Sequence, residues 1–300
     1  MRLGAHAKAM VETAPPGHPA PPIPRPPAWQ VLTLAALAVW LYYPTVLHLA
    51  AQWSHDPNFS HGFLVPLFSG FILWRERHHL SSLPLEPSWP GLAVLALAML
   101  LLVAGQLGAE LFLARVSLLV LLAGLVALLF GWNHLRAALF PWAFLLLMIP
   151  IPTILLNQIA LPLQLLASRV ASSTLPLLGV PVLREGNVLS LSVMTLEVAE
   201  ACSGIRSLMS LVTLAIIYGY FAERRMLVRI LLALAAVPIA VVANSFRIIG
   251  TGLLVQFWNP DKAEGFFHTF QGWLIFLVSM LLLFATHRLL LRILPEETSA

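Results

Sequence analysis

Charge is scarce in this chain. Only 10% of its 300 residues are Asp, Glu, Lys or Arg, whereas 59% are hydrophobic, and the mean hydropathy is +0.88. Soluble domains carry about 25% charged residues, so this composition excludes that class. The apolar residues fall in runs of about 20, the length with which a helix crosses a hydrocarbon core of roughly 30 Å. The sequence therefore predicts an all-α polytopic membrane protein whose main surroundings are the lipid bilayer.

Cysteine is scarcer still, because it occurs once, at Cys202. A single thiol excludes an intramolecular disulfide and any zinc or iron–sulfur site built from several cysteines. HExxH, GxSxG and P-loop patterns are absent from the sequence, so we expect neither a metal nor a cofactor. The net charge is +4, but no run of Lys and Arg exceeds two residues, which argues against nucleic acid as a partner.

Apolar segments of sufficient length predict about eight membrane-spanning helices. The candidate spans are residues 29–49, 61–74, 89–105, 111–131, 138–156, 203–221, 230–248 and 269–290. The alternation of polar and apolar residues over 184–197 predicts a short extracytoplasmic loop or hairpin before the sixth span. Residues 157–181 are expected to lie at the membrane interface.

Lys and Arg between the spans predict the orientation. With the N-terminus inside, 11 of the 17 Lys and Arg residues fall on the cytoplasmic side, as the positive-inside rule requires. Both termini are therefore expected in the cytoplasm. The Pro-rich residues 1–28 are expected to form a disordered cytoplasmic tail, residues 29–294 the transmembrane domain, and residues 295–300 a second short tail.

Cys202 is the first candidate for chemistry, because it lies where a polar loop passes into the sixth span. Ser203 is the expected N-cap of that helix. The positive end of the helix dipole would favour the thiolate at Cys202, and Gly204 would let a substrate backbone approach closely. The alternative is a small buried cysteine without a chemical role.

Arg247 and His268 are expected at the same membrane level as Cys202. The sixth and seventh candidate spans each have a length of about 28 Å at 1.5 Å per residue, and His268 opens the eighth. A nucleophile, a permanent cation and a titratable base suit acyl transfer. The alternatives are a snorkelling Arg247 and a structural His268. Asn244, at i, i+3 from Arg247, either bonds the guanidinium or satisfies backbone groups.

Residues near these three have open supporting roles. Glu200 either orients the substrate or the base, or complements the helix dipole. Arg206 either lowers the pKa of the thiol or pairs with Glu200. His61 belongs with Ser60 and Asp56 to a polar cluster on the same outer face, for which a solvated loop is favoured over a role in admitting substrate.

Around these residues the sequence resembles the exosortase family. The segments that carry the resemblance are AEACSGIRS at 199–207, ANSFRI at 243–248, GFFHTFQGW at 265–273, SHGFLVPLFSGFILWRER at 60–77, MIPIP at 148–152 and REGNVLSL at 184–191. Each motif is weak by itself, whereas the ordered set at these spacings is specific. The resemblance extends over residues 29–290.

The resemblance implies an activity and a substrate class. Cys202 would be the nucleophile, Arg247 the cation for the transition state or a substrate carboxylate, and His268 the general acid and base. The substrates would be exported proteins that end in a Pro-Glu-Pro motif, a transmembrane helix and a basic tail, processed at the periplasmic face of a bacterial inner membrane. A thioester would be released by an amine or by water, in connection with exopolysaccharide production.

A different class also fits the composition: a non-catalytic component of polysaccharide export, or a transporter. A transporter should carry charged residues near the middle of the membrane in paired halves. In this sequence the candidate residues are expected at one rim instead, which favours the enzyme. The sequence predicts no oligomeric state.

Overall fold

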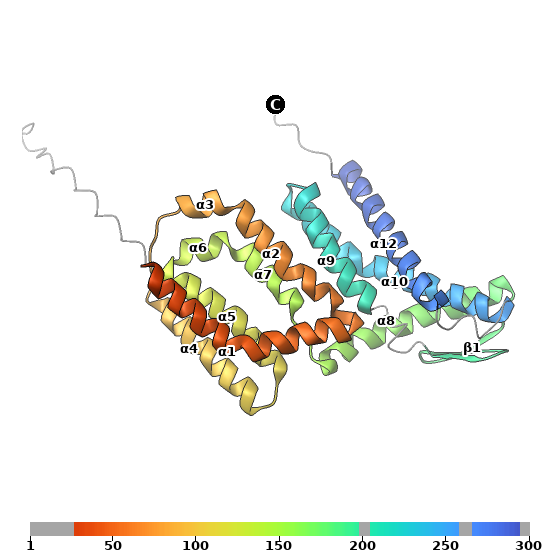
Figure 1. The fold of residues 1–300 in the computed structure, drawn as a ribbon. Helices are drawn as coiled ribbons and strands as arrows, with labels where there is room; N and C mark the ends of the chain where they lie inside the picture. The colour runs from red at the N-terminus through yellow and green to blue at the C-terminus, as the bar shows by residue number, and fades with distance from the viewer. Residues whose placement is uncertain (1–26, 198–204, 258–265, 295–300) are drawn as a thin grey trace, which may run out of the picture.

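The computed structural model describes residues 27–197, 205–257 and 266–294, without the side chains of 197 and 266–271. The N-terminal helices α1 to α7 form one group, α8 to α12 form a second, and a small sheet lies at the far end of the second group (Figure 1). The helices are α1 (Ala28–His55), η1 (Pro57–Phe63), α2 (Leu64–Arg75), α3 (Arg77–Ser82), α4 (Pro90–Leu107), α5 (Leu111–Leu129), α6 (Trp132–Ala137), α7 (Leu139–Phe144), η2 (Leu145–Met148), α8 (Thr153–Thr174), η3 (Leu175–Leu178), α9 (Ile205–Ala222), α10 (Met226–Phe257) and α12 (Phe266–Ile293).

Membrane-spanning helices dominate this architecture, which confirms the all-α polytopic class. Within the described residues, seven helical segments are long and apolar enough to cross a bilayer. These are α1, α4, α5, Thr153–Leu178, α9, α10 and Gly272–Ile293 of α12.

Three segments account for the difference from the eight expected spans. Residues 61–74 form the end of η1 and the 12-residue helix α2, which is about 18 Å long and therefore short for a bilayer. Residues 138–156 are divided into α7, η2 and the start of α8, because Pro150 and Pro152 do not continue a helix. Residues 157–181, expected at the interface, lie largely in α8, which qualifies as a span by length and composition.

Helix α10 is longer than predicted, since it continues ten residues past Arg247. Its last turns pack against α8 and the sheet through Ile248, Ile249 and Val255. Their buried partners include Ala167, Ala171, Leu175, Val180 and Leu189. In the view of Figure 1, α8 runs at a steep angle to α9. The sequence had placed Arg247 near the end of its span. In the structure Arg247 lies inside α10 instead.

The predicted hairpin is present as part of a three-stranded antiparallel sheet. Strands β1 (Val182–Glu185), β2 (Val188–Leu191) and β3 (Thr195–Glu197) lie in the order β1-β2-β3. Glu185 pairs with Val188, so the connecting turn is Gly186 and Asn187. Gly186 has a φ of 64°, which glycine adopts without strain and which a two-residue turn of this kind requires.

A buried charged cluster joins the helix ends opposite the site described below. Oε1 of Glu223 accepts hydrogen bonds from the backbone N–H groups of Arg224 (2.8 Å) and Arg225 (3.0 Å), and Oε2 lies 3.1 Å from Nη2 of Arg225. The Arg225 guanidinium also donates to the carbonyl of Leu294, just beyond α12. Nε2 of His287 lies 3.8 Å from Oε2. Sequence analysis did not single out this cluster.

Replacing Glu223 should make the free energy of unfolding less sensitive to a fall in pH. The Arg225 side chain, chiefly, and the backbone N–H groups hold the pKa of Glu223 at about 2, against 4.5 ordinarily, although burial opposes the shift. A lowered pKa stabilises the folded state above pH 4.5, and this contribution is lost as the pH falls from 4.5 towards 2. We expect Glu223→Gln to cost about 1–3 kcal/mol at pH 7, and the difference to vanish near pH 2.

Thermal unfolding of the detergent-solubilised chain, followed by tryptophan fluorescence across this pH range, measures the effect. The matched control is Glu185→Gln, because Glu185 is exposed on β1. A pH-independent loss for Glu223→Gln would contradict the role of its charge.

Candidate functional site

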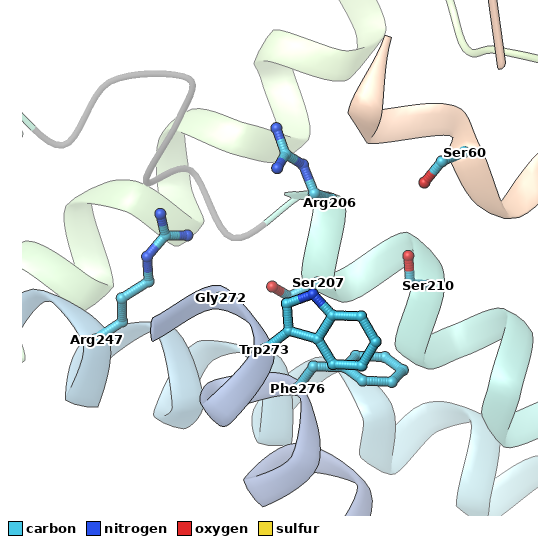
Figure 2. Close-up of a pocket in the computed structure, with 8 residues that line it drawn as sticks. All are labelled: Ser60, Arg206, Ser207, Ser210, Arg247, Gly272, Trp273 and Phe276. Carbon is cyan, nitrogen blue, oxygen red and sulfur yellow. The ribbon is translucent and has the colours of Figure 1, made fainter. Parts of the chain in front are cut away.

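A cavity of about 380 Å³ opens where η1, α9, α10 and α12 meet. We call it the outer cavity. Its lining residues are Ser60, Arg206, Ser207, Ser210, Arg247, Gly272, Trp273 and Phe276. Figure 2 shows the Ser60 and Ser210 hydroxyls pointing toward one another, with the Trp273 and Phe276 rings together on the α12 side. Residues far apart in the sequence therefore share one site.

The side chains that line the outer cavity carry a net positive charge. Arg206 and Arg247 come from two different helices, and the lining set contains no Asp or Glu. Two permanently charged guanidinium groups in one concave site attract an anionic group or stabilise developing negative charge on oxygen. The three serine hydroxyls add donors and acceptors for a polar ligand such as a peptide.

A second cavity of about 220 Å³, which we call the inner cavity, adjoins the outer one. The two share Ser60, Ser210 and Phe276. The other residues lining the inner cavity are His61, Leu64, Thr213, Leu214 and Ile217. Thr213 follows Arg206 by seven residues on α9, which places it about 10 Å further along the helix. The site therefore passes from a charged outer part to a mostly apolar inner part.

Two hydrogen bonds join the end of α1 and η1 to η2. Nε1 of Trp53 donates to the carbonyl of Met148 at 2.9 Å, and Nε2 of His61 donates to the carbonyl of Leu147 at 3.2 Å. Gly62 lies against the Trp53 indole so closely that a Cβ atom at this position would collide with the ring. The His-Gly pair of η1 and the end of η2 before the Pro-rich break are thus one structural unit.

His61 corrects an expectation. Sequence analysis favoured a solvated loop for this cluster, and Ser60 is exposed where it lines both cavities, but His61 is buried at 5% exposure and lines the inner cavity. Asp56 has a local role instead, because its side chain accepts the Asn58 N–H at 2.9 Å and caps η1. The reason is tertiary, since η1 packs against α9 and η2.

The structure brings together only some of the predicted site residues. Arg206 on α9 and Arg247 on α10 line one cavity. The backbone of His268 lies in the first turn of α12, four residues before Gly272 and hence on the same helix face. Asn244 is buried on α10 at 4% exposure. The remaining predicted residues, Glu200, Cys202, Ser203 and Gly204, lie outside the described residues.

Sequence analysis missed the polar face of α9. Ser207, Ser210 and Thr213 line the cavities together with Arg206. Their spacing of three to four residues puts them on one side of an otherwise apolar span, a signal that the sequence contains. Trp273 carried no comparable signal, because aromatic residues are common at membrane interfaces. In the described part of the chain, no three His, Cys, Asp or Glu residues gather in a way that could hold a metal ion.

Comparison with known proteins was informative at the level of the family. A family model described as transmembrane exosortase matches residues 53–285, which is more than half of the chain. The matched range includes η1, both arginines of the outer cavity, and positions 202 and 268. No curated protein and no solved structure matches the chain. The chain therefore belongs to the transmembrane exosortase family of membrane-embedded sorting enzymes.

Proposed function

We propose that this protein is a cysteine transpeptidase or protease that cleaves the C-terminal Pro-Glu-Pro sorting signal of exported proteins. The outer cavity is its active site, on the periplasmic face of a bacterial inner membrane, and its activity accompanies exopolysaccharide production. The observation that carries the proposal is the convergence of Arg206 and Arg247 on one concave site, beside the helix turn that contains His268.

Cys202 is the proposed nucleophile. It precedes Ile205, the first residue of α9, by three residues, and chain connectivity limits the separation of their Cα atoms to about 11 Å. Arg206, the next residue of α9, lines the outer cavity. Connectivity thus keeps Cys202 near the start of α9 and Arg206, a cation that favours the charged form of the sulfur.

The proposed reaction proceeds in two steps. In the first, Sγ of Cys202 bonds to the scissile carbonyl carbon, Arg247 stabilises the negative charge on the carbonyl oxygen, and the C–N bond breaks as His268 protonates the departing amine. In the second, His268 removes a proton from water or an acceptor amine, which attacks the thioester and releases Cys202. Hydrolysis and transfer share the thioester and differ only in this second nucleophile.

The direct test is co-expression of a tagged protein that ends in a Pro-Glu-Pro segment, an apolar helix and a basic tail. Wild type and Cys202→Ser are compared for the mass of the product and for a covalent adduct. We expect cleavage by wild type alone, with a thiol-linked intermediate, and the product mass identifies water or an amine as the acceptor. Equal processing by both proteins would favour the non-catalytic export or transport class.

His268→Ala should stop both steps, because no other group is assigned to move the proton. We expect a loss of processing on the order of 10²- to 10⁴-fold, the contribution of a general acid and base. The measurement is the rate of product formation at equal amounts of membrane-inserted protein. Normal processing by His268→Ala would remove this residue from the mechanism.

A further inference from the structure

Two residues that line the inner cavity each carry a buried polar atom with no hydrogen-bond partner among the described residues. The atoms are Nδ1 of His61 and Oγ1 of Thr213, in residues that are 5% and 1% exposed. The backbone carbonyl of Asn58 also interacts with the His61 ring, but no hydrogen bond joins it to Nδ1. Buried polar groups without partners are costly, so two of them in one small cavity point to a ligand.

The chemistry of these two atoms is complementary. The Leu147 carbonyl can only accept, so Nε2 of His61 carries the ring hydrogen and the uncharged ring presents Nδ1 as an acceptor. The Thr213 hydroxyl is able to donate. One acceptor and one donor in the same cavity match the N–H and C=O groups of a peptide backbone.

A peptide entering the membrane needs such partners. Water is not there to satisfy its N–H and C=O groups, and the first four N–H groups of a helix have no partner within the helix. The inner cavity continues from the outer cavity through Ser60, Ser210 and Phe276, and its other walls, Leu64 and Leu214 among them, are apolar. Its position thus follows the path from the charged rim into the bilayer.

We propose that the inner cavity binds the substrate backbone at the point where it passes from the active site into the membrane, with His61 and Thr213 as hydrogen-bond partners. This inference rests on the proposed function, because it takes the occupant of the outer cavity to be a polypeptide. His61 and Thr213 are positioning residues: they hold the substrate and do not take part in bond breaking.

Thr213→Val separates this role from a structural one. The change keeps the shape of the side chain and removes an unpaired buried hydroxyl, so the folded state should be as stable as before or more stable. We expect kcat/KM for the tagged fusion protein to fall about 3- to 10-fold, mainly through KM, which is the effect of one hydrogen bond. The matched control is Thr286→Val on α12, where the exposed hydroxyl bonds the Leu282 carbonyl.

An unchanged kcat/KM for Thr213→Val, or a loss that follows a lowered melting temperature, would overturn the inference. If wild type cleaves the fusion protein and Thr213→Val cleaves it equally well, the proposed function stands and the inner-cavity role fails. If wild type does not cleave it, the proposed function fails, and binding is then judged by crosslinking.

Photocrosslinking tests occupancy without turnover. A benzophenone side chain replaces Leu214, which lines the inner cavity, in the Cys202→Ala protein co-expressed with the tagged fusion protein. We expect a crosslink to the segment of the fusion protein between the Pro-Glu-Pro motif and the start of its apolar helix. The control position is Leu281, 68% exposed on α12, where we expect none. Crosslinks to lipid alone, or equal crosslinks at both positions, would overturn the inference.

Discussion

Cys202→Ala is expected to abolish processing of the sorting signal while the protein still accumulates in the membrane. Removing a nucleophile that forms the covalent intermediate should reduce the rate on the order of 10⁴-fold or more. Folding should tolerate the change, because a free cysteine and alanine are both small residues without strong polar requirements. Cleavage is measured by the mass of the tagged substrate, normalised to the amount of enzyme in the membrane.

The control for this variant is Ser279→Ala, a comparable loss of one heavy atom on α12, where the hydroxyl bonds the Ile275 carbonyl within its own helix. Since Cys202 is the only cysteine, a thiol reagent modifies a single position. A membrane-impermeant maleimide added from the periplasmic side should therefore label wild type once and stop processing. Normal processing by Cys202→Ala would remove the thiol from the mechanism, and labelling only from the cytoplasmic side would reverse the proposed orientation.

Arg247→Lys should be the second most damaging change, although it keeps the positive charge. Lysine replaces a planar group with several N–H donors by a compact point charge, and an oxyanion or carboxylate held by two parallel hydrogen bonds loses that geometry. Losing one donor to an oxyanion typically costs about 10²- to 10³-fold in kcat, so we expect a defect of about 10²-fold. The measurement is kcat and KM for the fusion protein in proteoliposomes.

Arg169→Lys is the matched control, because Arg169 is exposed on α8 and lies outside the lining set of the outer cavity. We expect it to leave both constants unchanged. The division between kcat and KM also assigns the role of Arg247. A fall in kcat indicates stabilisation of the transition state, whereas a rise in KM with kcat unchanged indicates binding of a substrate carboxylate. Full activity of Arg247→Lys would leave only a point-charge role.

Local signals were sufficient for part of the fold. Hydropathy identified six of the seven candidate spans of the described residues but not α8, which was expected at the membrane interface. The alternation over 184–197 predicted the hairpin, because this feature depends on residues close together in the sequence. The same signals failed over 61–74 and 138–156. There the apolar residues belong to short helices, and hydropathy does not show where prolines or packing interrupt a helix.

The site shows the same division. Arg206 and Arg247 were predicted because charged residues beside membrane spans are costly, and the structure brings both to the outer cavity. The side chains of Cys202 and His268 lie outside the described part of the structure, so their place in the site remains a prediction. The inner cavity was not foreseen, because it depends on η1 lying against α9, so that Ser60 and His61 face Ser210 and Thr213 across it.

By itself the sequence determined that this chain lies in a membrane and that it has one thiol, and it predicted that the candidate catalytic residues of three segments lie at a similar level. Composition and helix length are enough for these conclusions, because the bilayer imposes its own dimensions on any spanning helix. The tertiary structure decided that η1 completes the site, that His61 is buried, and that a second cavity leads from the arginines toward the apolar interior. Those features arise from packing between segments about 150 residues apart, which no local periodicity encodes.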